Sequence, residues 1–168
     1  MGRELRMVPP NWEHPKKHDG RYQPMYNRTF KESVKDWLEG LAKWYGGERS
    51  EENSEFEYWE WSGNPPDRDY YLPEWDVEPT WYQAYETVSE GTPVTPPFAT
   101  KEELVDYLVE QGDFWYQSDI AERGFSNFRS KYSRKAAAAF VEGGHAPSLL
   151  VTCDDSGVSV KQGIECLG

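Results

Sequence analysis

The stretch TFKESVKDWLEGLAKWYGG, residues 29–47, is the segment that most clearly determines local fold in this chain. Its apolar residues recur at intervals of three and four, which predicts a helix with one buried face. They are Phe30, Val34, Trp37, Leu38, Leu41 and Tyr45. Thr29 and Glu32 have the spacing of a capping box, in which the two side chains satisfy free amides at a helix start. The glycine pair 46–47 predicts the end of the helix.

Two further helices are expected in the second half of the chain. Thr100 and Glu103 repeat the capping-box spacing, and Leu104 and Leu108 follow on one helical face. A third helix is expected over about 126–142, because aromatic and alanine residues recur there every four positions.

Strands are expected where aromatic and β-branched residues cluster, since these side chains suit a pleated surface. The segments are 3–8, 56–61, 81–88 and a hairpin over 148–160. Together the elements predict an α+β fold, with about three helices packed on a small, mostly antiparallel sheet. The length of 168 residues predicts a single domain over 1–168. Within it we expect an irregular proline-rich N-terminal segment (1–28) and an acidic aromatic insert (48–79).

The charge of the chain is concentrated in its middle. The net charge is −12 overall, and residues 46–119 alone hold nineteen Asp and Glu against three Lys and Arg. Such a field repels phosphates, so direct binding of nucleic acid is not expected. It attracts a basic surface on a partner protein, although plain solubility is the more common reason for an acidic chain and is the favoured explanation of the charge by itself.

Segments that would direct the chain to a membrane are not evident in the sequence. No run of about 18 apolar residues is present, and the first residues do not form a signal peptide. The two cysteines, Cys153 and Cys166, fit neither a disulfide framework nor a zinc signature. We therefore expect no membrane association, reduced thiols and a cytoplasmic location.

Candidate catalytic and metal-binding residues are few. His14 and His18 could share a helical face, but Pro15 lies between them, so we expect a solvated loop and not a metal site. A nucleophilic pair of Cys153 or Cys166 with His145 is disfavoured, and Cys153 is expected to pack within an apolar strand. Phosphate-loop, dinucleotide and hydrolase motifs are absent from the sequence. The expectation is a protein without catalytic residues, metal or cofactor.

The segment 51–61 combines glutamates with aromatic residues and is the strongest candidate for a partner-binding site. Aromatic rings anchor interfaces, and acids can pair with Arg or Lys of a partner. The candidate residues are Glu52, Glu55, Glu57, Trp59, Glu60 and Trp61. If the segment is a strand, both tryptophans point the same way. The alternative is an edge strand whose rings cover the core.

A second reading is a small-ligand binder or an enzyme. Here aromatic residues would line a pocket for a nucleotide or signal molecule, as pockets of this kind are mostly apolar with a few polar groups. The residues expected near its mouth are Tyr85, Glu86, Glu90 and Thr92.

Three stretches resemble a set of small proteins encoded by tailed bacteriophages and prophages. They are NWEHP (11–15), YETVSEGTP (85–93) and PFATKEEL (97–104), and the later Ala146-Pro147-Ser148 is similar too. The resemblance implies no particular activity and no catalytic residues. Small acidic phage proteins often inhibit bacterial machinery, including CRISPR immunity. The resemblance thus favours a non-enzymatic phage protein that binds and inhibits a bacterial host protein with a basic surface, in the host cytoplasm. A component of virion assembly is a further alternative.

Overall fold

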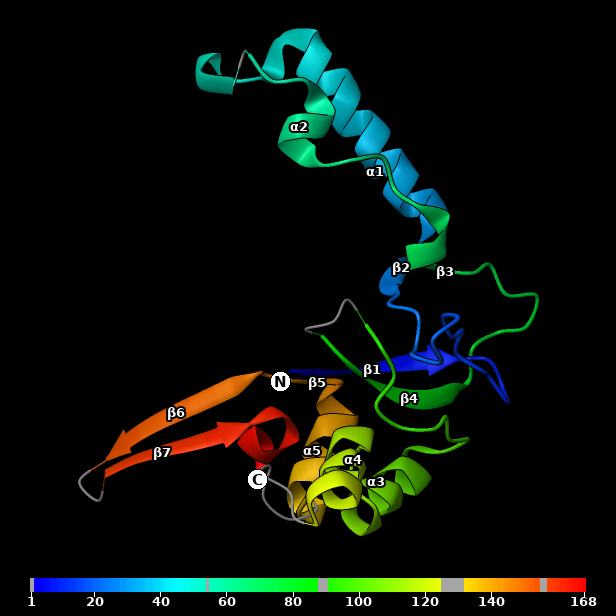
Figure 1. Cartoon of the computed structure of the whole chain (residues 1–168), viewed down its shortest axis with the longest axis vertical. Coiled ribbons are helices and arrows are strands. Elements are labelled where there is room, and N and C mark those ends of the chain that lie inside the picture. The colour runs from blue at the N-terminus through cyan, green and yellow to red at the C-terminus, as the bar shows by residue number, and fades with distance from the viewer. Residues whose placement is uncertain (1, 54, 88–90, 125–131, 155–156) are drawn as a thin grey trace. The chain divides into compact units, whose positions relative to one another are not determined.

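The computed structural model describes residues 2–53, 55–87, 91–124, 132–154 and 157–168. Helices and strands are mixed, which confirms the expected α+β class (Figure 1). The chain divides into two compact units. Unit 1 comprises Met1–Pro24 and Trp75–Gly168, and unit 2 comprises Met25–Glu74. The single domain over 1–168 stays a prediction.

Unit 1 is built on a three-stranded antiparallel sheet with the order β4-β1-β5. The strands are β1 (Arg3–Val8), β4 (Trp81–Glu86) and β5 (His145–Ala146). In the register of β1 and β4, Leu5 lies opposite Ala84, and Arg6 lies opposite Gln83. Because side chains alternate between faces along a strand, Leu5 and Ala84 lie on one face, the apolar side, whose end also carries the buried pair Arg3 and Glu86. Arg6, Gln83 and Tyr85 lie on the other, polar, face.

Three helices gather on the apolar side of this sheet (Figure 1). They are α3 (Lys101–Glu110), α4 (Phe114–Arg123) and α5 (Arg134–Gly143). Leu104 and Leu108 of α3, Phe140 of α5 and Ala84 of the sheet are fully buried together. The capping box of α3 is confirmed, because the Thr100 hydroxyl accepts from the Glu103 amide at 3.2 Å.

In this region the sequence reasoning missed one helix and placed the start of another too early. The sequence reasoning missed α4, which begins after Asp113, whose side chain accepts from the Tyr116 amide at 3.0 Å. The helix expected over 126–142 begins only at Arg134, because Ser133 serves as its N-cap and accepts from the Ala136 amide. Residues 126–131 of that expectation lie outside the described residues.

The C-terminal part of unit 1 is a hairpin followed by a short helical turn. The hairpin strands are β6 (Leu149–Asp154) and β7 (Gly157–Gln162), as expected. The turn η4 (Gly163–Leu167) buries Ile164 in the core of unit 1. The expectation that Cys153 packs inside the protein is wrong, since this residue is exposed on the hairpin.

Unit 2 is organised around α1 (Phe30–Lys43), whose predicted capping box of Thr29 and Glu32 is confirmed. The helix continues as η1 (Trp44–Glu48) and is followed by η2 (Glu51–Asn53), α2 (Tyr58–Ser62) and η3 (Arg68–Tyr70). The short strands β2 (Tyr26–Thr29) and β3 (Tyr71–Leu72) pair in parallel. Leu38 and Tyr45 were expected on the buried face of α1, but both are more than half exposed.

The strand expected over 56–61 is wrong, because most of this segment forms the short helix α2. Its buried residue Tyr58 packs against Trp37 and Trp44, with ring centroids 5.2 and 5.9 Å apart. The Tyr58 hydroxyl lies so close to Gly40 that a Cβ at that position would overlap it. The helix also gains a local cap, since the Glu57 amide donates to the Glu60 carboxylate at 2.8 Å.

Candidate functional site

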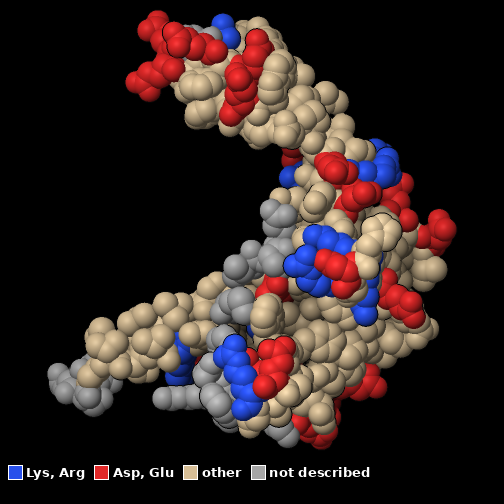
Figure 2. Space-filling view, in the orientation of Figure 1, with Lys and Arg blue, Asp and Glu red and all other residues tan. Residues whose placement is uncertain are grey.

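The six residues proposed for partner binding lie together on unit 2, and all six are exposed. We call this set the acidic aromatic surface: Glu52, Glu55, Glu57, Trp59, Glu60 and Trp61. The Trp59 side chain is 47% exposed and that of Trp61 58%. Figure 2 shows acidic side chains gathered at the same end of unit 2. Over 48–60 the sequence has six glutamates and a single arginine, so the local field is strongly negative.

The two tryptophans do not point the same way, contrary to the strand-based expectation. In a helix, residues two apart are rotated by about 200° around the axis. Trp61 therefore faces Trp44, on which it stacks with centroids 5.9 Å apart and planes 25° apart. Trp59 lies on the other flank of α2. The acidic aromatic surface thus extends around both flanks of this helix.

Two further aromatic residues enlarge the exposed area next to this surface. Tyr45 is 57% exposed and Phe56 48%. The Tyr45 hydroxyl donates to the Glu57 carboxylate, and this hydrogen bond is the main cause that raises the pKa of Tyr45 above its usual value. The sequence reasoning had assigned Tyr45 to a buried helix face. Only its contact with Glu57 shows that it belongs to this part of unit 2.

A cleft of about 620 Å³ in unit 1 is a second candidate site. It lies on the polar face of the sheet, where the N-terminal segment after β1 crosses it. The lining comprises Trp12, Glu13, His14, Pro15, Lys16, Tyr22, Gln83, Thr95, Pro96, Pro97 and Phe114. His14 is only 7% exposed, so the expectation of a solvated loop at this residue is wrong. The volume is in the range typical of small-molecule sites.

The floor of the cleft is a chain of hydrogen bonds between buried side chains. His14 Nε2 lies 2.6 Å from the Gln23 carbonyl oxygen, and His14 Nδ1 lies 3.2 Å from the Tyr85 hydroxyl. That hydroxyl donates to Gln83 Oε1 at 2.8 Å, and Gln83 Nε2 donates to the Thr95 carbonyl at 2.7 Å. These polar atoms already have protein partners, so the floor holds the segment in place.

The electrostatics of the floor favour uncharged groups. Burial is the main cause that lowers the pKa of His14, and nearby Arg6 lowers it further. Burial likewise raises the pKa of Tyr85 to about 12. Both side chains are therefore uncharged at neutral pH, and the single proton of the Tyr85 hydroxyl is directed at Gln83 and not at His14.

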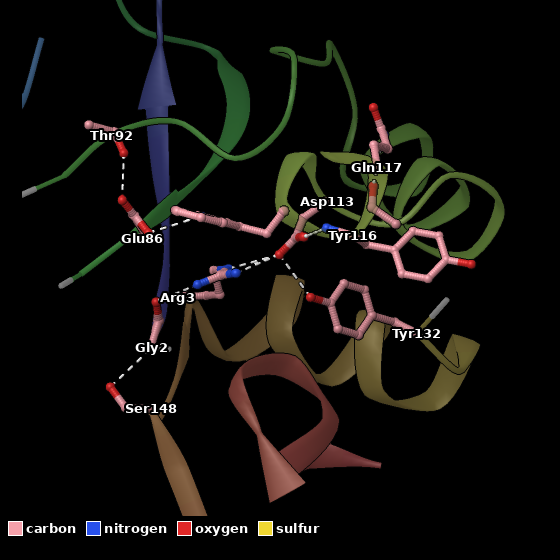
Figure 3. A network of polar contacts seen from close by, with 11 residues as sticks. Gly2, Arg3, Glu86, Thr92, Asp113, Tyr116, Gln117, Tyr132 and Ser148 are labelled. Carbon is pink, nitrogen blue, oxygen red and sulfur yellow. Dashed lines mark hydrogen bonds and ion pairs between the residues drawn. The ribbon is translucent and has the colours of Figure 1, made fainter. Parts of the chain in front are cut away.

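On the opposite side of the sheet, Arg3 and Asp113 form the centre of a buried network (Figure 3). Asp113 Oδ2 accepts from Arg3 Nη2 at 2.6 Å, from Arg3 Nε at 3.1 Å and from the Tyr132 hydroxyl at 2.8 Å. Both members of the ion pair are at least 95% buried. The network ties β1 to the start of α4 and, through Tyr132, to the segment just before α5. It is therefore a structural junction.

The residues of the ligand-binding alternative are divided between the two faces of the sheet. Glu86 accepts from the Thr92 hydroxyl at 2.7 Å and from Trp115 Nε1 at 3.0 Å, next to the Arg3 network (Figure 3). Tyr85 points to the other face, where it contacts His14. Glu90 lies outside the described residues. The structure brings Glu86 and Thr92 together but does not place Tyr85 with them.

No protein-family model, curated protein or solved structure matches this chain.

Metal and thiol chemistry find little support in the part of the chain that the structure describes. There, no group of three or more His, Cys, Asp or Glu residues could hold a metal ion. Burial raises the pKa of the Cys166 thiol, which disfavours the thiolate needed for nucleophilic attack. His145 is exposed on β5. Among the same residues, no helix has the length and apolar character needed to cross a bilayer.

Proposed function

We propose that this chain is a non-enzymatic binding protein whose acidic aromatic surface occupies a basic surface of a partner protein. The observation that carries the proposal is the difference in exposure among the aromatic side chains of unit 2. Trp44 and Tyr58 are buried in its interior and the partly exposed Trp37 packs against Tyr58, whereas Trp59 and Trp61 stay about half exposed among glutamates. Trp59 and Trp61 therefore present exposed aromatic surface that a partner can cover.

The energy available from these rings is sufficient for specific binding. A large aromatic side chain has about 150–250 Å² to bury, and about half of that remains accessible at Trp59 and Trp61. At about 25 cal/mol per Å², covering each ring contributes about 2–3 kcal/mol. The glutamates add less affinity, but they steer a cationic partner and disfavour acidic ones.

A basic surface of this kind is found where proteins hold nucleic acid. The acidic aromatic surface would compete with phosphates for the same Arg and Lys side chains. Together with the resemblance to phage proteins, this supports an inhibitor of a bacterial nucleic-acid-handling protein, such as a defence complex. The nucleic acid and this chain should then exclude one another from the partner.

The test is an affinity capture from bacterial lysate with two variants of matched charge. The first changes Glu52, Glu55 and Glu60 to Gln, which keeps side-chain size and a cap-competent residue at position 60. The control changes Glu78, Glu110 and Glu142, which are exposed in unit 1, to Gln. We expect a captured protein that is lost with the first variant, kept with the control and released by added nucleic acid. Equal capture by both variants would show that the acidic aromatic surface is not the binding site.

A second candidate function, small-ligand binding, is favoured by the volume and aromatic lining of the cleft. A thermal-shift screen with nucleotides tests it, because a ligand at 100 times its Kd stabilises a protein by about 2.7 kcal/mol. A real ligand should raise the melting temperature of the wild type and not that of Phe114→Ala. No shift with any nucleotide would remove this class of ligand.

A further inference from the structure

Two opposite charges line the cleft of unit 1. Glu13 brings a carboxylate to the cleft and Lys16 an ammonium group, and both side chains are exposed. Within the part of the chain that the structure describes, neither group forms an ion pair, whereas Arg21 of the same segment pairs with Asp19 at 2.6 Å. The cleft therefore offers one negative and one positive group to a ligand.

The backbone that carries these two charges is held in place. Lys16 pairs with Tyr22 in an antiparallel bridge. His14, which lies between the two charged residues in the sequence, is anchored through its Nε2 atom, 2.6 Å from the Gln23 carbonyl oxygen. Because Glu13 and Lys16 are three positions apart, their Cα atoms are separated by at most about 11 Å. A compact ligand with two opposite charges can therefore contact both side chains.

The cleft beside these charges has aromatic walls. The rings of Tyr22 and Phe114 are almost parallel, with planes 8° apart and centroids 6.2 Å apart, and Trp12 also lines the cleft. The Lys16 ammonium lies 5.0 Å from the centroid of the Tyr22 ring, so the positive group is held next to the aromatic wall. A flat ring that enters the cleft can stack on such a wall or meet it edge-on.

The overall charge of the chain restricts which ligand suits the cleft. With a net charge of −12, the chain repels anions. A nucleotide would bring its phosphate charges to a cleft that is lined by one lysine and also by a glutamate. A zwitterion has no net charge to be repelled, and its two charged groups match those of the cleft. An aromatic α-amino acid combines such a pair of charges on one carbon atom with a flat ring.

We propose that the cleft binds a free aromatic amino acid, such as tryptophan, in its zwitterionic form. The Glu13 carboxylate accepts hydrogen bonds from the ammonium group of the ligand, and the Lys16 ammonium donates to the carboxylate of the ligand. The ring of the ligand lies against Tyr22 and Phe114, above a floor whose polar atoms keep their own protein partners. Such binding rests on the small-ligand function proposed for the cleft and is independent of the acidic aromatic surface of unit 2.

Isothermal titration calorimetry of the full chain with related probes tests this assignment. L-tryptophan has both charges, tryptamine lacks the carboxylate, and indole-3-propionate lacks the ammonium group. The wild type should bind L-tryptophan about 10-fold or more tightly than either of the other two, because each of them lacks one charge-assisted hydrogen bond. L-leucine has the same two charges without a ring and should also bind more weakly than L-tryptophan.

Two variants connect each charge of the cleft to its partner group on the ligand. Lys16→Met should lose the preference for L-tryptophan over tryptamine. Glu13→Gln should lose the preference for L-tryptophan over indole-3-propionate. Lys17→Met is the matched control and should bind all probes as the wild type does, because Lys17 is exposed next to Lys16 but does not line the cleft.

The possible outcomes separate the amino-acid ligand from small-ligand binding in general. An affinity for L-tryptophan that neither Lys16→Met nor Glu13→Gln changes would overturn the proposal. So would a wild type that binds tryptamine or indole-3-propionate as tightly as L-tryptophan. If L-tryptophan does not bind, but a nucleotide stabilises the wild type and not Phe114→Ala, the amino-acid ligand is wrong and small-ligand binding stands. If neither compound binds, both are wrong.

Discussion

Replacement of Asp113 should show how strongly the buried network holds unit 1 together. The Asp113→Ala variant removes the carboxylate from Arg3 and the N-cap of α4. Breaking a buried ion pair costs about 3–5 kcal/mol. Glu86 lies opposite Arg3 in the sheet and its negative charge partly balances the guanidinium, so we take the lower end of this range, about 3 kcal/mol. Loss of the cap adds about 1 kcal/mol, which gives about 4 kcal/mol in total.

The assay is urea unfolding followed by circular dichroism, with two companion variants. Asn is a good N-cap, so Asp113→Asn should destabilise by about 1 kcal/mol less than Asp113→Ala. Asp19→Asn removes the exposed pair of Asp19 and Arg21 and should leave the midpoint unchanged. If Asp113→Ala unfolds at the same urea concentration as Asp19→Asn, the argument that the network joins β1 to α4 is wrong.

Three further predictions concern single features of the two units. Tyr58→Ala should destabilise unit 2 by about 3–5 kcal/mol in a urea titration, because Tyr58 is buried between two tryptophans; a change below about 1 kcal/mol would contradict this packing. The Trp59→Ala, Trp61→Ala double variant should have a urea midpoint close to that of the wild type but should no longer capture the partner. A larger loss of stability than in Tyr58→Ala would refute the role of these two rings as exposed anchors for a partner. The lowered pKa of His14 means that this side chain takes up a proton more readily in the unfolded chain than in the folded one. The free energy of unfolding should therefore be highest above about pH 6.5 and should fall as the pH drops from there to the folded pKa. His14→Gln should weaken this pH dependence, and an unchanged profile would exclude His14 as its source.

The elements that could be predicted from the sequence are those whose signals are local. Thr29 with Glu32 and Thr100 with Glu103 cap helices through contacts within one turn, so their spacing is enough to place α1 and α3. The hairpin strands also follow from their own composition. The exposure of Leu149, Val151, Val158 and Val160 on this hairpin could not be predicted, since it depends on what the rest of unit 1 leaves uncovered.

The errors arose where a distant contact decides the local structure. The segment 56–61 is rich in aromatic residues and would suit a strand, but Tyr58 packs against α1 at Gly40, and this contact favours α2. His14 follows prolines typical of a loop, yet Tyr85 and Gln23 bury it against the sheet. For the candidate site, composition located the glutamates and tryptophans of the acidic aromatic surface. It could not show that Trp59 and Trp61 lie on different flanks, because that depends on the helix.

The dependence of partner affinity on salt, measured by calorimetry with the captured protein, tests the central proposal most directly. Wild-type affinity should fall steeply as salt rises, and the Glu52→Gln, Glu55→Gln, Glu60→Gln variant should bind more weakly, with an affinity that depends less on salt. Trp61→Ala should lose about 30-fold or more in affinity, equivalent to about 2 kcal/mol, while the salt dependence stays as in the wild type. Affinity that is independent of salt and unchanged in both variants would contradict binding through the acidic aromatic surface.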